Sequence, residues 1–186
     1  MTNELEIMVR ELHDRQCIHD KLVAYCRAVD RMDRDLLLTV YHPDAIDDHG
    51  LFVGGPEEFA DWAFGLHQAQ QHSHQHVITN HSCELDGDVA HTETYWFFAA
   101  MNRDPEMLTI GGGRYIDRFE KRNGEWRIAA RKCVPEWGGE PGPSWLAPAA
   151  AAALASSGTV SRDRGDSSYE RPLAIATERV GYRFAL

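Results

Sequence analysis

The sequence predicts a single α+β domain in which helices come first and a meander of antiparallel strands follows. Three observations support this class. Apolar side chains recur near helical spacing over the first 30 residues, a Gly-Gly-Pro turn opens another helix at Pro56, and four strand-like segments separated by turn residues follow. Helices followed by such a meander imply a curved sheet with helices on one face. The 186 residues, 43% of them hydrophobic, suffice to bury one core.

Two helices are expected before the first strand. The first runs from Asn3 to about Asp30, with a break near Asp14 left open, and its apolar positions are Leu5, Met8, Leu12, Ile18, Leu22, Tyr25 and Val29. Asp33 can cap a second, short helix over 34–40. That helix must end before Pro43, because proline disfavours helical geometry in the residue before it.

A strand or hairpin is expected from Ala45 to Val53, ahead of a third helix. Pro56 lies near the first position of that helix, and two glutamates follow in its first turn. Four strands come next, over about 72–85, 89–100, 108–121 and 125–134. The sequences Asp86-Gly87-Asp88 and Arg122-Asn123-Gly124 are strong signals for hairpin turns between them.

The composition changes after Trp137. A Gly- and Pro-rich linker and an alanine-rich stretch follow, and charged and aromatic residues return towards the end. We therefore expect a domain over 1–137 and a partly low-complexity extension over 138–186. The extension could dock on the core or on a neighbouring subunit, or it could be a solvated tail.

Net charge indicates the class of binding partner, and the spacing of the cysteines indicates the state of their thiols. The formal net charge of −10 disfavours binding to nucleic-acid phosphates or to an anionic membrane surface, so a small molecule or another protein is the expected partner. No apolar run is long enough for a membrane span and the N-terminus lacks a signal-peptide pattern, which predicts a cytoplasmic protein. The cysteines show no metal-binding spacing, so free thiols are expected at Cys17, Cys26, Cys83 and Cys133.

Asp30 and His76 occupy positions that local structure alone does not favour. A carboxylate at a helix C-terminus meets the negative end of the helix dipole, at a cost of roughly 0.3 to 1 kcal/mol when exposed. An imidazole held by a carboxylate has a fixed tautomer and a stabilised cation, as a general base requires. The two could therefore form a catalytic dyad. The alternative is that Asp30 only pairs with a nearby arginine and that His76 is an ordinary core histidine.

A histidine cluster offers a second hypothesis. Strand alternation puts His72, His74 and His76 on one face, with His67 and His81 nearby, and three histidines on one face can bind zinc. The favoured interpretation is that His72 and His74 lie in a polar loop and only His76 points inward, so no metal and no other cofactor is expected. The run Gly111-Gly112-Gly113 lies within a strand pattern, where it permits a bulge or bend and does not form a phosphate loop.

Aromatic residues are the candidates for a substrate-binding surface. The strand over 89–100 carries Tyr95 and Phe97 on one face and Trp96 and Phe98 on the other, and either set could line a cavity or simply pack in the core. We assign substrate contact to five aromatic side chains: Phe52, Phe59, Trp62, Tyr95 and Phe97.

Several short motifs, in order and spacing, resemble the SnoaL-like branch of the nuclear transport factor 2-like superfamily over roughly residues 5–137. They are Tyr25 to Asp33, Tyr41-His42-Pro43-Asp44-Ala45, Gly55-Pro56-Glu57-Glu58-Phe59, His76-Val77-Ile78-Thr79-Asn80 and Asn123 to Ile128. The resemblance implies a cone-shaped α+β barrel whose curved, mostly antiparallel sheet wraps around the N-terminal helices and encloses an apolar pocket. It also implies assembly into dimers or trimers.

Members of that family include scytalone dehydratase, hexachlorocyclohexane dehydrochlorinase, bile-acid 7α-dehydratase, ketosteroid isomerase and polyketide cyclases, and several are not enzymes. By resemblance, Asp30 and His76 match the family's His/Asp dyad, Tyr25 a catalytic tyrosine and Arg131 a pocket arginine. The dehydrochlorinase has a lysine at the position of Tyr25, so this chain looks closer to enzymes that expel oxygen. The resemblance thus implies a cofactor-independent dehydratase acting on a hydrophobic, carbonyl-bearing cyclic or polyketide-like molecule. An isomerase or cyclase with the same dyad, or a non-catalytic binding protein, is the alternative.

Overall fold

The computed structural model describes residues 2–104, 107–139 and 161–165. The chain divides into two compact units, residues 1–143 and 144–186. In the second unit the described residues form a turn in which Gly165 donates its backbone N–H to Asp163. The boundary expected at 137 falls inside a strand that runs to Gly139. The predicted low-complexity segment, and most of the predicted extension, lie outside the described residues.

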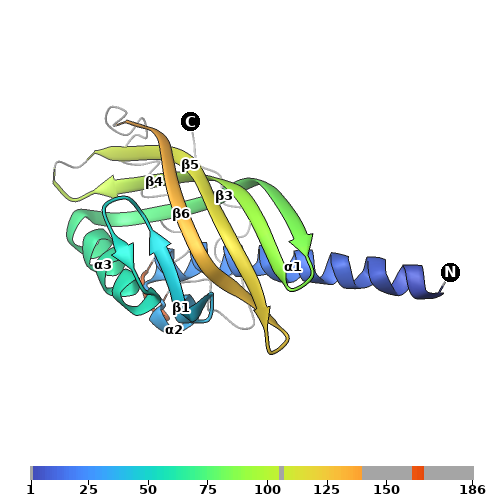
Figure 1. Cartoon of the computed structure of the whole chain (residues 1–186). Helices are drawn as coiled ribbons and strands as arrows, with labels where there is room; N and C mark the ends of the chain where they lie inside the picture. The colour runs from blue at the N-terminus through green and yellow to red at the C-terminus, as the bar shows by residue number, and fades with distance from the viewer. Residues whose placement is uncertain (1, 105–106, 140–160, 166–186) are drawn as a thin grey trace, which may run out of the picture. The chain divides into compact units, whose positions relative to one another are not determined.

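Three helices precede or interrupt the strands of the first unit, as predicted: α1 (Thr2–Arg31), α2 (Arg34–Leu38) and α3 (Pro56–Gln70). Helix α1 is continuous, without the break considered at Asp14. The Asp14 carboxylate instead accepts hydrogen bonds from Lys121 Nζ at 2.7 Å and Trp126 Nε1 at 2.8 Å, which tie α1 to the sheet. Figure 1 shows α1 crossing the sheet and projecting past it at its N-terminal end. No described helix has the length and apolar character needed to cross a membrane.

The strands form one curved, unclosed sheet. Within the described residues they are β1 (Tyr41–Asp48), β2 (Val53–Gly54), β3 (Gln71–Asp86), β4 (Val89–Asn102), β5 (Leu108–Arg122) and β6 (Glu125–Gly139). Their order is β2-β1-β6-β5-β4-β3, and β1 runs parallel to β6 while the other pairs are antiparallel. The α+β class with a curved, mostly antiparallel sheet is therefore confirmed, with β2 and β3 as its edges.

The hairpin turns follow the sequence signals. Gly87, Asn123 and Gly124 have φ angles of 59°, 54° and 82°, the left-handed geometry of the tight turns that match strand twist. β1 begins at Tyr41, four residues before the predicted start at 45, and it includes Pro43. The register against β6 shifts between Tyr41 and Ile46, so this proline lies where the ladder is irregular.

The end of α1 fixes the position of Asp30. Met32 adopts a φ of 55°, and the backbone N–H groups of Met32 and Asp33 donate to the carbonyls of Val29 and Ala28 at 3.3 and 2.9 Å. These two bonds are the Schellman arrangement, here with methionine where glycine is usual. The Asp33 side chain then accepts from Leu36 N at 3.0 Å and caps α2. Asp30 therefore sits one residue before a sharply closed helix end.

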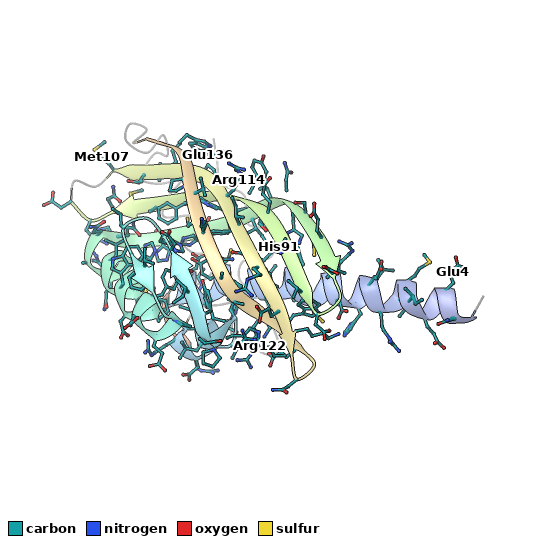
Figure 2. All side chains as sticks on the ribbon, viewed as in Figure 1. Glu4, His91, Met107, Arg114, Arg122 and Glu136 are labelled. Carbon is teal, nitrogen blue, oxygen red and sulfur yellow. The ribbon has the colours of Figure 1, made fainter. Side chains whose placement is uncertain are left out.

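The core lies between α1 and the inner face of the sheet. Ile18, Leu22 and Val29 of α1 pack with Phe119 and Ile128 there, all 0 or 1% exposed. Gly112 and Gly113 of β5 admit large neighbours, since a Cβ on Gly112 would come within 2.3 Å of the Trp137 ring and one on Gly113 within 2.1 Å of the Val134 carbonyl. The outer face of the sheet carries charged side chains. Arg114 forms ion pairs with Glu136 at 2.7 Å and with Glu93 at 2.9 Å. Figure 2 labels Arg114 and Glu136.

Candidate active site

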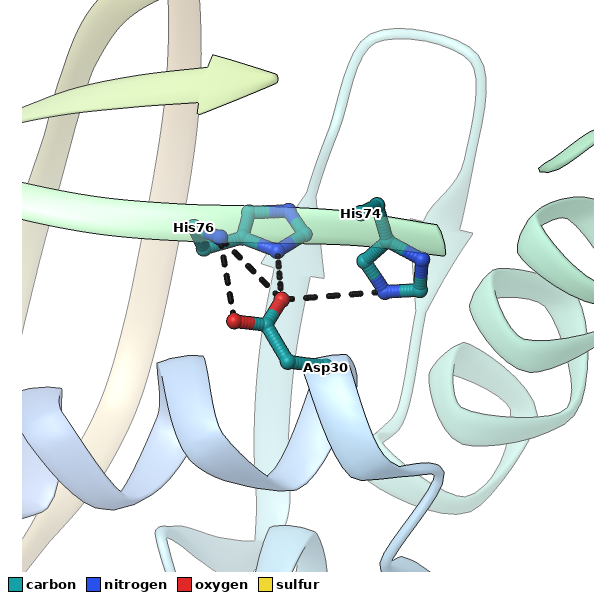
Figure 3. Close-up of side chains that lie close together, drawn as sticks. All are labelled: Asp30, His74 and His76. Atoms are coloured by element: carbon teal, nitrogen blue, oxygen red, sulfur yellow. Dashed lines mark hydrogen bonds and ion pairs between the residues drawn. The ribbon is translucent and has the colours of Figure 1, made fainter. Parts of the chain in front are cut away.

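Asp30 and His76 are in direct contact. Asp30 Oδ1 lies 2.8 Å from His76 Nδ1, and both carboxylate oxygens accept from the His76 backbone N–H at 3.1 Å. Figure 3 shows the carboxylate reaching from the end of α1 to β3. Since a carboxylate accepts, Nδ1 carries the hydrogen and Nε2 the lone pair. The two side chains are 13% and 10% exposed, so water screens the pair only weakly.

His74 joins this group from the same face of β3. Its Nε2 lies 3.2 Å from the Val29 carbonyl and 3.7 Å from Asp30 Oδ1, and its ring stacks on that of His67 with centroids 4.1 Å apart. Burial, together with the neighbouring His67 and His76, lowers the pKa of His74 to about 3, so the ring is neutral. The expectation that His72 and His74 belong to a polar loop is wrong, because both lie in β3; His74 is buried and His72 is exposed.

Asp30, His74 and His76 offer the geometry for a metal ion, since one ligand atom from each lies within 4.8 Å of the others among the described residues. The orientation of His74 argues against that use. Its Nε2 faces the backbone carbonyl of Val29, and a nitrogen that donates to a carbonyl has no lone pair for a metal. We therefore interpret His74 as a buried neighbour that crowds and orients Asp30.

A mainly apolar cavity of about 570 Å³ adjoins the dyad, within the usual size range of small-molecule sites. His76 of β3 lines it, as do residues from α1, α3, β4, β5, β6 and the loop after β1. The aromatic members of the lining are Tyr25, Phe59, Trp62, Trp96, Phe98, Tyr115 and Trp137. The wall can thus hold a flat, hydrophobic molecule against the imidazole of His76.

Two of the five predicted substrate contacts line the cavity directly, Phe59 and Trp62. Phe52 lies behind them, with its ring stacked on Trp62 at a centroid distance of 5.3 Å. The assignment of Tyr95 and Phe97 is contradicted: they are 41% and 36% exposed on the outer face of β4, and their neighbours Trp96 and Phe98 line the cavity instead. Alternation along β4 separates the two sets, and the less polar one faces inward.

Tyr25 lines the cavity and contacts a histidine that the sequence analysis missed. Its hydroxyl lies 3.3 Å from Nε2 of His49, whose Nδ1 contacts Oδ1 of Asp47. Burial raises the pKa of Tyr25 well above its usual value, so the hydroxyl keeps its hydrogen. The spacing of Asp47 and His49 could have revealed the contact between these two residues, because side chains two positions apart in a strand lie on one face.

Arg131 does not reach the cavity wall. Its guanidinium makes two hydrogen bonds of 2.7 Å to Asp117, and both side chains are fully buried. The charged group lies 4.2 Å from the ring centroid of Tyr25 and 4.1 Å from that of Tyr115. Arg131 is therefore absent from the cavity lining, where the resemblance placed it, and its guanidinium packs against the two tyrosine rings instead.

The cysteines are unpaired, as expected, although only Cys26 is fully buried. Burial raises the pKa of Cys26 and of Cys133, which lines the cavity, to about 12. Both remain protonated thiols at neutral pH and are poor nucleophiles.

The sequence matches a known family model, and the fold is similar to those of solved structures. The family model for the SnoaL-like domain matches residues 10–132. A hexachlorocyclohexane dehydrochlorinase, LinA type 2, superimposes with a TM-score of 0.70 at 20% identity, covering 75% of this chain and 97% of that one. A candidate scytalone dehydratase from Novosphingobium aromaticivorans gives 0.64 at 14% identity, covering 72% and 91%.

A nuclear transport factor 2-like protein from Salmonella enterica serovar Typhimurium gives a TM-score of 0.60 at 20% identity, covering 66% of this chain and 90% of that one. A search of curated proteins finds no match to this chain. At these identities the superpositions show a shared fold, and the domain match spans most of the first unit. The chain belongs to the SnoaL-like domain family.

Proposed function

We propose that this protein is a lyase that eliminates water from a hydrophobic cyclic molecule bearing a carbonyl, with His76 as general base. The observation that carries the proposal is the 2.8 Å contact between Asp30 and His76 at the edge of an apolar cavity. An imidazole base, oriented by a carboxylate and facing an apolar space, suits removal of a proton beside a carbonyl. The proposed reaction needs no cofactor.

In the proposed reaction, Nε2 of His76 takes a proton from the carbon next to the carbonyl. The electrons of that C–H bond form the new double bond, the C–O bond of the neighbouring hydroxyl breaks, and the hydroxyl leaves as water after it gains a proton. Asp30 stabilises the imidazolium that forms. The Tyr25 hydroxyl, which stays protonated, donates a hydrogen bond to a substrate oxygen.

The cavity supports the choice of substrate class. Its volume of about 570 Å³ accommodates a fused-ring molecule, and its walls offer aromatic faces with few polar groups. The superposition on a dehydrochlorinase and on a candidate dehydratase is consistent with elimination, since both reactions named for those proteins remove a proton and a leaving group. An isomerase or cyclase would share the proton abstraction but not the loss of water.

Two probes separate these alternatives. α-Tetralone in D₂O reports proton abstraction, because exchange at the carbon beside its carbonyl is visible by NMR. Its β-hydroxy derivative reports elimination, because loss of water yields fluorescent α-naphthol. We expect wild-type protein to accelerate both, and His76→Ala to slow both by about 10² to 10⁴-fold, the usual contribution of a general base. Asp30→Asn should slow both by a similar order and not add fully to His76→Ala, since the two residues act as a unit.

His72→Ala is the matched control, because His72 lies on the same strand but is exposed and outside the cavity lining. It should retain wild-type rates, as should wild-type protein treated with a chelator. Exchange without elimination by the wild type would favour an isomerase or cyclase. Absence of both reactions, with either probe seen bound by NMR, would instead favour a binding protein. Undiminished rates in folded His76→Ala would refute the dyad.

A further inference from the structure

A second histidine–carboxylate pair faces the same cavity from a different part of the chain. His49 follows β1 and lines the cavity, and its Nδ1 contacts Asp47 Oδ1. Asp47 is 1% exposed, and its other oxygen accepts the Tyr41 hydroxyl at 2.6 Å. The carboxylate thus fixes the tautomer of His49, as Asp30 does for His76. Nε2 of His49 is left to exchange protons with a partner.

That partner is Tyr25. Its hydroxyl lies 3.3 Å from His49 Nε2, and its ring meets the His76 ring edge-on with centroids 6.4 Å apart. Tyr25 therefore contacts both imidazoles. The backbone also holds His49, because its N–H donates to the Phe52 carbonyl at 2.8 Å and its carbonyl accepts from Leu51 at 2.8 Å. The ring packs on Phe59 with centroids 4.7 Å apart.

We propose that Asp47 and His49 form a second acid–base pair that delivers a proton, through the Tyr25 hydroxyl, to the hydroxyl that leaves in the elimination. This inference rests on the proposed function. Protonated His49 gives its Nε2 proton to the Tyr25 oxygen while Tyr25 gives its own proton to the departing oxygen, so that water leaves and tyrosine is unchanged. His76 ends the step protonated and His49 ends it neutral, and solvent restores both.

A proton relay explains how Tyr25, although a very weak acid, can protonate the leaving hydroxyl. Burial raises the pKa of Tyr25 well above its usual value, and the nearby Asp47 raises it further against the opposing Arg131. A tyrosine that gave up its proton alone would leave a buried anion. Protonated His49 avoids this charge, because it refills the hydroxyl as the proton departs.

Several ionisable groups surround His49. Asp47 and Tyr25 contact it directly, and its ring lies 6.3 Å from that of Tyr115. The paired charges of Arg131 and Asp117 lie behind these tyrosines. Elimination by this route requires His76 neutral and His49 protonated. The pH profile of kcat/KM is therefore bell-shaped, whereas exchange into α-tetralone needs only neutral His76 and lacks the fall at high pH.

The test compares the two probes in His49→Gln, whose amide can still hydrogen-bond Tyr25 but cannot supply a proton. The ratio of elimination to exchange should fall at least 100-fold, and the high-pH fall in elimination should disappear, which a merely structural role would not cause. Tyr25→Phe should reduce the same ratio and not add fully to His49→Gln. His81→Gln is the control, because His81 is a half-buried histidine outside the cavity lining.

Where His49→Gln does not fold, as judged by thermal unfolding, Asp47→Asn carries the same test. An unchanged ratio of elimination to exchange in a folded variant, or a retained high-pH fall, would overturn the second pair and leave the His76 dyad standing. Failure of the wild type to catalyse either reaction would remove the proposed function, and this inference with it.

Discussion

Asp30 illustrates how a functional group can occupy a locally unfavourable place. A carboxylate near the end of α1 meets the negative end of the helix dipole, which costs roughly 0.3 to 1 kcal/mol when exposed. Three contacts with His76 offset that cost, one to the ring and two to the backbone N–H. The two backbone contacts hold the carboxylate independently of the ring, as the proposed mechanism requires. Asp30 is therefore oriented by β3 as well as by its own helix.

His74 should make the protein less stable in mild acid. Its folded-state pKa is about 3, against an ordinary value of 6.5, so between these values the unfolded chain binds a proton that the folded chain does not. The free energy of unfolding therefore falls as pH drops below 6.5, by up to about 1.4 kcal/mol per pH unit from this residue. Urea unfolding at several pH values would measure it. His74→Asn should flatten the slope, and an unchanged slope would disprove the assignment.

The dyad could be predicted from sequence, whereas other parts of the site could not. Asp30 and His76 stand out because neither suits its local structure. His49 was missed although the strand or hairpin predicted over 45–53 contains both it and Asp47, because local sequence does not show that its side chain lines a cavity. The choice of Tyr95 and Phe97 failed because alternation gives two faces without saying which is inner. That distinction depends on which face α1 covers.

Substitutions of two glycines would measure how much backbone conformation contributes to the free energy of unfolding in a helix and in a turn. Gly65 lies in the middle of α3 and Gly124 in the last hairpin at a φ of 82°, and a Cβ on either would meet no atom within 4 Å. We expect Gly65→Ala to raise the free energy of unfolding by about 0.5 to 1 kcal/mol and Gly124→Ala to lower it by about 1 to 2 kcal/mol. Chemical denaturation of both variants provides the measurement, and equal effects of one sign would contradict the argument.

Helices and hairpins were predictable because their signals are local. Pro56, Asp33 and the Asn123-Gly124 turn each mark an end through their own backbone preferences. The early start of β1 was not predictable, because Tyr41 enters the sheet through a parallel pairing with Ile128 of β6, more than 80 positions away, and Pro43 follows where the register shifts. Proline usually indicates an edge strand, a strand start or a bulge, but here long-range pairing brings the segment around Pro43 into the sheet.

The buried Arg131–Asp117 pair links the sheet to the cavity. Arg131→Met would leave the Asp117 carboxylate buried without its partner, so we expect a loss of about 3 to 5 kcal/mol in the free energy of unfolding. The double variant Arg131→Met with Asp117→Leu should lose less, since no charge is left unpaired. Urea denaturation of the wild type, the single variant and the double variant measures these free energies. A loss of under 1 kcal/mol in Arg131→Met would show that the ion pair contributes little to stability.

Self-association is expected from the outer face of the sheet. Val77, Tyr95, Phe97 and Ile116 are each 36 to 43% exposed there, beside the Arg114–Glu93 ion pair, and Val77 lies directly opposite Phe97 in the ladder. We expect a dimer or trimer by light scattering at micromolar concentration, and dissociation in Phe97→Glu. His91→Glu, on the same face of β4 and labelled in Figure 2, is the control. A monomeric wild type would defeat this prediction.

The contact between Asp30 and His76 joins positions 46 apart in the chain, one on a helix and one on a strand. Closing so long a loop is entropically costly, and the contact is gained only when α1 docks on the sheet. Separate helical or hairpin segments therefore hold neither an oriented base nor an enclosing wall. Under the proposed function, a partly folded chain therefore has no half-active form, because the imidazole of His76 acquires its partner only when the core closes.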